Sequence, residues 1–416
     1  MRKFFILFAA IAAFSMLFSC NENGPDGPVP DPGEDRVVII YFSAANSLSR
    51  YAEDNYMSMR EGTYLPALGG NEHLLVFFHN RDVAPVLIEM SRDPEGNVVE
   101  KEICSFKDMQ VSASAESVEK VLTYVKERYV SESYGLILWS HSTGWLPEHY
   151  YTEGAPSGYD NPADAPAEPS SHVDVYGDAI VKMAVPEVSP ASFGQDEETE
   201  QEIDIKELSS AIPMHLDFLI FDSCLMGCVE VAYQFRDVAD IFCASPTEIL
   251  ANGFPYSHIV EPLFWSDLNA GVKEVADLYF YYYSESGSPY ATISVVDCSR
   301  LESLASACKA IYDENREKVG GLDMGSIQPF FRLNKHWFYD LGSFVDALEP
   351  SDELVEDFRK AMSDAVVFKE HTDTFISIEI TEYSGLSTYV QNPEEPYLDD
   401  YYRTLDWNIA TGMVAE

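Results

Sequence analysis

Basic residues are scarce in this sequence. Its 416 residues contain 26 Lys and Arg against 70 Asp and Glu, which gives a formal net charge of −44. Because contacts to phosphate need clustered Lys and Arg, this balance argues against a nucleic-acid-binding protein. An excess of acidic side chains keeps a protein soluble and favours cationic ligands.

Long apolar runs are scarce too, and the one at the N-terminus indicates export. Arg2 and Lys3 precede an apolar run over residues 4–18, shorter than the roughly 20 residues that a membrane-spanning helix needs. This is the pattern of a secretory signal. Cys20 follows Ser19 directly, and this ending resembles the lipobox of bacterial lipoproteins. We therefore expect lipidation of Cys20 and a lipoprotein of the cell envelope; an ordinary signal beside a chance Cys is the alternative.

The N-terminal composition sets the domain boundaries. We expect a signal peptide over residues 1–19 and a lipidated, flexible, acidic tether over residues 20–35. Residues 21–35 hold five acidic residues, four Pro and three Gly, a composition that does not pack into a core. We assign residues 36–265 to a main unit and residues 266–416 to a C-terminal extension that supports it.

Cysteine is infrequent and does not show metal-site spacing. With Cys20 set aside, six of the seven Cys remain, and no C-x-x-C pair recurs at zinc spacing. We therefore interpret most of them as small buried apolar residues.

After the tether, short apolar runs alternate with amphipathic helical patterns. The first are a strand over residues 36–42, a helix over 47–60 and a strand over 73–79. This alternation is typical of βαβ units and predicts an α/β sandwich with a mostly parallel central sheet. Residues 147–199 interrupt it with a long irregular segment. Further predicted strands cover residues 86–92, 135–139, 218–221, 241–244, 291–296 and 375–380, and further helices cover 115–128, 204–211, 226–235, 266–283, 300–318 and 352–367.

Two of these strands end close to chemically active residues. His141 follows the strand at 135–139, and Cys224 follows the strand at 218–221. Ligands of open α/β sheets bind beyond the carboxyl ends of strands, so the two side chains meet if the strands are neighbours. Cys224 is also expected at the start of a helix, whose dipole favours a thiolate. A Cys with a distant His is the minimum for thiolate catalysis, while two unrelated structural residues are the alternative.

Two motifs carry a family resemblance. Residues 136–145, LILWSHSTGW, resemble the His motif of the clostripain family of cysteine peptidases, and residues 218–227, FLIFDSCLMG, resemble its Asp-x-Cys-Leu-Met motif. The resemblance implies a caspase-like α/β/α fold and a Cys/His endopeptidase that cleaves after Arg or Lys. Shorter likenesses lie at residues 40–48, 230–233, 253–256 and 339–344.

The resemblance assigns roles residue by residue. It implies that Cys224 is the nucleophile, that His141 is the general base, and that the backbone N–H groups of Cys224 and Ser142 hold the oxyanion. The family usually has Gly at the position of Ser142, and a Ser is strained there if the backbone needs a positive φ. Asp222 stands where the family places a carboxylate for a basic P1 side chain; a helix cap is the alternative. Glu248 is a weaker second candidate, with a solvated loop acid as the alternative.

Maturation and cofactors follow from the same resemblance. Family members can be processed between the two motifs, and Lys182 is the basic residue that the irregular segment offers for such a cut. No cofactor is required, although some members need calcium. The acidic run at residues 196–202 is a possible Ca²⁺ site, but a solvated charge run is the better interpretation, since it lacks the spacing of a calcium loop.

Protein or peptide substrates with basic P1 residues are the expected partners, and the lipid anchor is the expected membrane contact. The rival hypothesis is a catalytically inactive lipoprotein that binds cationic peptides in the same acidic crevice, with Ser142 as its main support.

Overall fold

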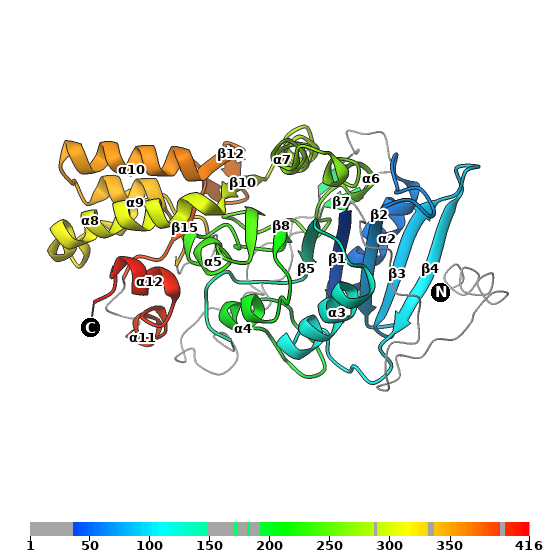
Figure 1. The fold of residues 1–416 in the computed structure, drawn as a ribbon. Coiled ribbons are helices and arrows are strands. Elements are labelled where there is room, and N and C mark those ends of the chain that lie inside the picture. Colours follow the sequence, from blue (N-terminus) through cyan, green and yellow to red (C-terminus); the bar gives the residue numbers. More distant parts are fainter. Residues whose placement is uncertain are drawn as a thin grey trace.

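The structure is a computed structural model that describes residues 36–148, 170–172, 181–183, 192–286, 289–331, 337–391 and 396–415. A nine-stranded sheet forms the centre of this part of the chain (Figure 1). In spatial order its strands are β12 (Val366–His371), β10 (Thr292–Asp297), β9 (Ala239–Ala244), β8 (Leu216–Asp222), β5 (Tyr134–Trp139), β1 (Arg36–Ala44), β2 (Glu72–Asn80), β3 (Val86–Arg92) and β4 (Val98–Ser105).

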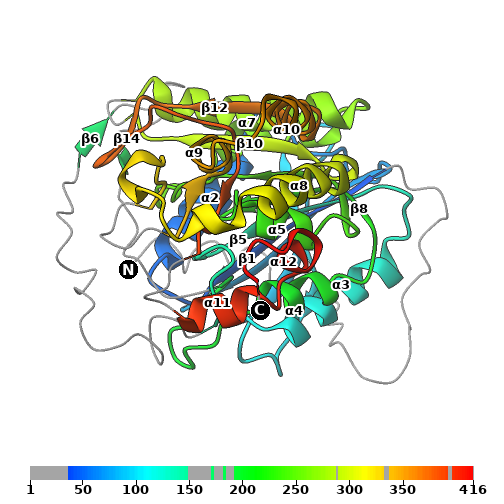
Figure 2. The same ribbon diagram turned by 90° about the vertical axis from the view of Figure 1, so that its left-hand side faces the viewer.

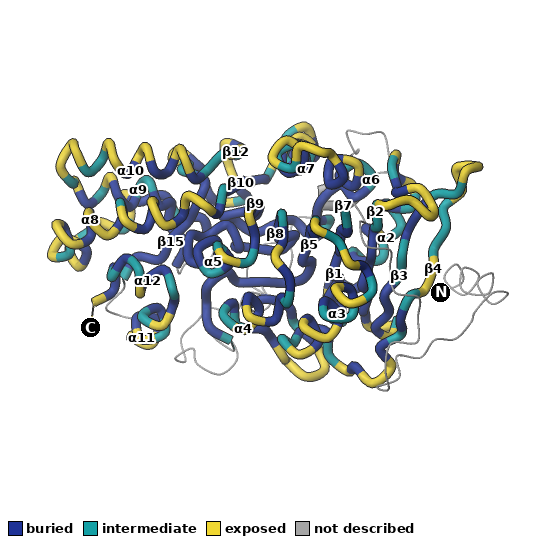
Figure 3. The backbone as a smooth tube through the Cα atoms, in the orientation of Figure 1, coloured by how far each residue is buried: buried dark blue, intermediate teal, exposed yellow. Residues whose placement is uncertain are grey.

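The middle of the sheet is parallel and its margins are antiparallel. Strands β9, β8, β5, β1 and β2 run parallel to one another, while β3 and β4 on one side and β10 and β12 on the other pair antiparallel. The central strands are buried over almost their whole length (Figure 3). Such burial on both faces explains why they read as continuous apolar runs rather than as alternating ones.

Helices cover both faces of the sheet. Along β1, Val37, Ile39 and Tyr41 belong to one hydrophobic core, whereas Val38 and Ile40 belong to the other, as the two-residue period of a strand requires. The first core is covered by α3 (Ala115–Arg128), α4 (Ile205–Ser210), α5 (Val229–Gln234) and α8 (Leu301–Val319), and the second by α2 (Ser49–Glu61), α6 (Tyr256–Ile259) and α7 (Leu268–Ser284). The result is the predicted α/β/α sandwich.

The C-terminal part of the chain extends the same sheet. Strands β10 and β12 lie beyond residue 265, and further helices of this part of the chain gather beside α8 at the left end of Figure 1 and face the viewer in Figure 2. These helices are α9 (Leu341–Ala347), α10 (Asp352–Ala365), α11 (Pro396–Tyr402) and α12 (Asp406–Thr411). The remaining elements are the 3₁₀ helices η3 (Pro262–Phe264), η4 (Cys298–Arg300) and η5 (Met324–Ser326), and three two-stranded sheets: β6 (Ser170–His172) with β7 (Val181–Met183), β11 (Tyr339–Asp340) with β15 (Ser387–Thr388), and β13 (Thr374–Phe375) with β14 (Ile378–Glu379).

Several predicted elements differ from the structure at their ends. The helix expected over residues 352–367 ends at Ala365, because the β-branched pair Val366 and Val367 begins the edge strand β12. In place of the strand expected over residues 375–380, the structure has a hairpin of two short strands with two residues each. Ile376, between these strands, has a φ of 54°. None of the helices in the described ranges has the length and hydropathy that a membrane crossing requires.

Candidate active site

Two neighbouring parallel strands deliver the candidate side chains to one edge of the sheet. Strands β5 and β8 pair in parallel, with Trp139 opposite Asp222 as the last pair of the register. His141 and Cys224 each follow their strand by two residues, so both lie at the carboxyl edge. The condition under which the two side chains were expected to meet, that these strands are neighbours, is therefore met.

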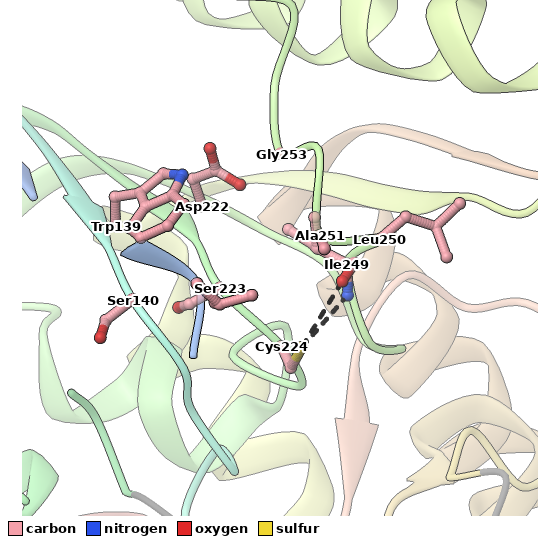
Figure 4. A pocket seen from close by; sticks show the side chains of 10 residues that line it. Trp139, Ser140, Asp222, Ser223, Cys224, Ile249, Leu250, Ala251 and Gly253 are labelled. Atoms are coloured by element: carbon pink, nitrogen blue, oxygen red, sulfur yellow. Dashed lines mark hydrogen bonds between the residues drawn. The ribbon is translucent and has the colours of Figure 1, made fainter. Parts of the chain in front are cut away.

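The Cys224 thiol lies against the loop that follows β9. Cys224 is 9% exposed, and its Sγ accepts a hydrogen bond from the backbone N–H of Ile249 at 3.4 Å. The thiol also donates to the carbonyl oxygen of Ile249, with Sγ and O 3.7 Å apart (Figure 4). The backbone of Ile249 thus holds the Cys224 sulfur through both its N–H and its carbonyl group.

The prediction that Cys224 lies at the start of a helix is wrong. Helix α5 begins at Val229 rather than near Met226, and Cys228 is its N-cap. Cys224 therefore lies ahead of the first helical turn, beyond the short range of a helix-terminus effect. Leu225 instead has a φ of 63°, and its N–H donates to the carbonyl of Thr247 at 2.9 Å. The nucleophile candidate thus stands on a strained turn, and strain of this kind costs about 1–3 kcal/mol.

His141 is buried and makes one hydrogen bond through its ring in the described part of the chain. It is 3% exposed, and its Nε2 lies 2.9 Å from the hydroxyl oxygen of Ser47. Burial lowers the pKa of the His141 imidazole to about 4, so the ring is neutral at pH 7. Sequence reasoning gave Ser47 no role, although Ser47 follows the carboxyl end of β1 just as His141 follows β5.

Ser142 joins the two turns. Its hydroxyl donates to the carbonyl oxygen of Cys224, and the residue is buried. The strain expected at a Ser in this position is absent, because Ser142 does not have a positive φ. The left-handed residue of this turn is Gly144, with a φ of 63°. A Cβ there would lie 2.6 Å from the carbonyl oxygen of Leu225, so the glycine lets the two turns approach.

Asp222 shares a cavity with Cys224. It is 3% exposed, and its Oδ2 accepts hydrogen bonds from the N–H of Phe254 at 3.1 Å and the hydroxyl of Tyr256 at 3.0 Å. The other oxygen, Oδ1, has no hydrogen-bond partner among the described residues. Burial raises the pKa of the Asp222 carboxyl to about 7. The cavity is lined by Leu48, Trp139, Ser140, Asp222, Ser223, Cys224, Ile249, Leu250, Ala251 and Gly253 (Figure 4).

The cavity is narrow, and Gly253 controls the approach to the carboxylate. Its volume of about 20 Å³ is enough to hold a water molecule. Gly253 has a φ of 67°, and a Cβ there would lie 2.6 Å from Oδ2 of Asp222. Any larger residue would therefore displace the carboxylate.

The other sequence-predicted residues lie elsewhere. Glu248 is 2% exposed and is not among the residues that line the cavity, so it is a buried acid rather than a solvated one. Lys182 lies on strand β7, opposite Ser171 of β6, within the segment predicted to be irregular. Cys20 lies outside the described residues. Because Glu248 is buried, the alternative that it is a solvated loop acid is wrong.

The acidic run at residues 196–202 forms a turn. Oδ1 of Asp196 accepts hydrogen bonds from the N–H and the hydroxyl of Thr199, at 3.0 and 2.9 Å. Within the described ranges, no three His, Cys, Asp or Glu residues gather closely enough to hold a metal ion.

Adjacent parallel strands that bring a thiol and an imidazole to one edge of an α/β/α sandwich define the class of caspase-like cysteine peptidases. The family model of the clostripain family matches residues 40–165 and 174–408 of this sequence. The chain therefore belongs to the clostripain family and is a cysteine protease.

Solved structures give the same assignment. An inactive zymogen C11 protease from Parabacteroides distasonis is 30% identical, with a TM-score of 0.73; the match covers 92% of this chain and 99% of that one. A secreted C11 cysteine protease from Bacteroides thetaiotaomicron, solved with an irreversible peptide inhibitor, is 27% identical, with a TM-score of 0.71 and coverage of 91% and 98%. A comparison with curated proteins finds no match.

Proposed function

We propose that this protein is an exported endopeptidase that cleaves after Arg or Lys through a dyad of Cys224 and His141. The observation that carries this proposal is the shared cavity of Cys224 and Asp222. A carboxylate with a free oxygen beside a thiol suits a peptide whose P1 side chain is a cation, because the cation and the scissile carbonyl then reach the two groups together.

The chemistry starts from a neutral pair. The low pKa of His141 leaves its imidazole unprotonated, so it accepts the thiol proton as sulfur attacks the carbonyl carbon. A C–S bond forms and the carbonyl π electrons move onto oxygen. Collapse of this intermediate re-forms C=O and breaks the C–N bond, while the imidazolium gives its proton to the leaving amine. Water then hydrolyses the thioester, with His141 again as the base.

The backbone N–H groups of Cys224 and Ser142 hold the oxyanion in this proposal. The hydrogen bond from the Ser142 hydroxyl to the Cys224 carbonyl supports it, because it fixes the two turns relative to each other. Fixed donors cost no reorganisation when charge develops on the carbonyl oxygen. Ser142 has no positive φ, so the backbone strain that would have favoured an inactive peptide-binding lipoprotein is not present at this position.

The location in the cell follows from the N-terminus. We place the mature protein at the cell envelope as a lipoprotein, held through Cys20; the secreted B. thetaiotaomicron relative supports export. Replacement of Cys20 by Ser should move the protein from the membrane fraction to the soluble fraction. An unchanged distribution would contradict the anchor.

Peptides with Arg, Lys or norleucine at P1 and a fluorogenic leaving group test the proposed activity. Wild type should release product from the Arg and Lys peptides, and the Cys224→Ala variant should not. Norleucine is matched to Lys in length but has no charge, so equal rates with norleucine and Lys would contradict the basic preference. If the protein binds the Arg peptide without cleaving it, the rival hypothesis of an inactive peptide-binding lipoprotein would be favoured instead.

A further inference from the structure

The His141 ring is held by a neutral group. In the described part of the chain its hydrogen bond is to Ser47, at 2.9 Å from Nε2. Burial alone accounts for the lowered pKa of His141, with no contribution from a charged neighbour. A carboxylate partner would raise that pKa and favour the imidazolium, whereas a hydroxyl leaves the ring neutral.

Which ring nitrogen serves as the base depends on this contact. A neutral imidazole has one N–H and one lone pair, and the hydrogen bond that one nitrogen makes influences which atom carries the proton. We propose that Ser47 is the positioning residue for His141. A hydroxyl can donate to Nε2 or accept from it. In this proposal the Ser47 oxygen accepts the Nε2–H, which leaves on Nδ1 the lone pair that receives the Cys224 proton. This assignment rests on the proposed dyad.

The backbone around Ser47 is fixed on both sides. Oδ1 of Asn46 accepts from the N–H of Leu48 at 2.9 Å, and Nδ2 of Asn46 donates to the carbonyl of Gln195 at 2.9 Å. Asn46 itself is buried. These contacts hold the turn that presents the Ser47 hydroxyl to the ring.

The same neighbouring segment holds His141. The N–H of Gly194 donates to the His141 carbonyl at 2.9 Å, one residue before the Gln195 carbonyl that anchors Asn46. The hydroxyl and the imidazole are thus set against each other by one short stretch of chain. Side chains held by such outer contacts keep an orientation that a free rotor would lose.

Ser47 is suited to a clean test because it does not line the cavity and its residue is exposed. The Ser47→Ala variant should therefore fold and bind substrate normally. We expect its kcat to fall about 10- to 100-fold, the usual cost of losing an orienting partner, with KM unchanged. Ser47→Thr keeps the hydroxyl and should restore most of the rate.

Ser49→Ala is the matched control. The Ser49 hydroxyl lies two residues further along and accepts from the N–H of Arg81 at 3.2 Å, with no bond to His141. This variant should keep the wild-type kcat. Equal losses in Ser47→Ala and Ser49→Ala would show that the turn matters only for structure, and would overturn the proposal.

A second readout does not depend on turnover. The ¹⁵N spectrum of histidine-labelled protein at pH 7, assigned by difference with His141→Gln, reports which ring nitrogen carries the proton. We expect Nε2–H for His141 in wild type and a mixture of tautomers in Ser47→Ala. Nδ1–H in wild type, or an unchanged tautomer in the variant, would refute the role of Ser47. If wild type cleaves no peptide, the proposed function fails, and the spectra still decide the role of Ser47.

Discussion

The turn at Cys224 and the start of α5 at Cys228 lie four residues apart and differ in their access to the cavity and in their backbone conformation. The first opens onto a cavity, and the strained residue Leu225 follows its thiol directly. The second is fully buried, and burial raises the pKa of the Cys228 thiol well above its ordinary value. The proposed nucleophile is therefore distinguished from Cys228 by the cavity it lines and by its turn, and not by a helix terminus.

The second region is instead an anchor for the C-terminal part of the chain. Glu230 is buried, and its Oε1 accepts hydrogen bonds from the Thr388 hydroxyl at 2.8 Å, the Tyr389 N–H at 2.9 Å and the Tyr402 hydroxyl at 2.6 Å. Trp145, four residues after His141, packs against the rings of Tyr389 and Tyr402. Thr388, Tyr389 and Tyr402 thus contact the chain just beyond both turns.

The largest expected effect separates the two cysteines. Cys224→Ala should lower kcat for an Arg peptide by about 10⁴-fold or more, as removal of a nucleophile does. Cys228→Ala should keep most of the activity, since its thiol is fully buried and does not line the cavity beside Cys224. Cys243→Ala, which also removes a fully buried free thiol, is the control. Comparable losses in all three folded variants would remove the distinction.

Asp222→Asn should give the next largest effect. The amide keeps the shape of the carboxylate but leaves a substrate guanidinium unpaired, which costs about 2–5 kcal/mol in kcat/KM. Norleucine peptides should be affected much less. Glu248→Gln serves as the comparison, because that buried acid does not line the cavity; a larger selective loss there would move the pocket carboxylate to Glu248.

The pH dependence of substrate binding follows from the raised pKa of Asp222. Below about pH 7 the empty pocket is neutral, so kcat/KM for Arg and Lys peptides should rise as the pH increases through about 7. Asp222→Asn should lose this limb of the profile. If the rise of kcat/KM through about pH 7 persists in the Asp222→Asn variant, another group is responsible for it.

Stability should follow the opposite trend. Because the folded pKa of Asp222 lies above its ordinary value of 3.8, the folded state holds a proton between about pH 4 and 7 that the unfolded state has released. The contribution of Asp222 to the free energy of unfolding should therefore fall as the pH rises through that window. Thermal unfolding should show Asp222→Asn more stable than wild type at pH 8, with little difference at pH 4.

The anchor region should show a loss of stability without a loss of chemistry. Tyr402→Phe removes one hydrogen bond to the buried Glu230 carboxyl, which should cost about 1–3 kcal/mol in the free energy of unfolding. The kcat of the folded fraction should stay near that of wild type. A fall in kcat with unchanged stability would show that α11 acts on the catalytic turns directly.

We expect the smallest effect on activity from self-cleavage during maturation. This cleavage does not directly involve the turn at Cys224 or the start of α5. We propose that the chain, if latent, is cut after Lys182. Intact mass after incubation with and without Ca²⁺ should then show two fragments meeting at Lys182 in wild type, and a single chain in Cys224→Ala and in Lys182→Gln. A fully active chain that remains in one piece would show that cutting is unnecessary.

The sequence predicted the sandwich and the two strand ends well, because both depend on local signals. The apolar runs of β5 and β8 are continuous, and their ends place His141 and Cys224. Ser47 escaped prediction, since nothing in a lone Ser reveals that a residue 94 positions away will turn its ring towards it. The start of α5 was misplaced for a similar reason, because Leu225 adopts a positive φ that its residue type does not signal.

Active-site labelling tests the central claim most directly. Wild type is incubated at pH 8 with a peptide that carries Lys at P1 and an electrophilic ketone, and the modified residue is located by mass spectrometry. The account predicts one adduct, on Cys224, formed more slowly in Asp222→Asn and not at all in His141→Ala at matched times. An adduct on Cys228 or on any other cysteine, or labelling of Cys224 at the same rate by the norleucine analogue, would contradict it.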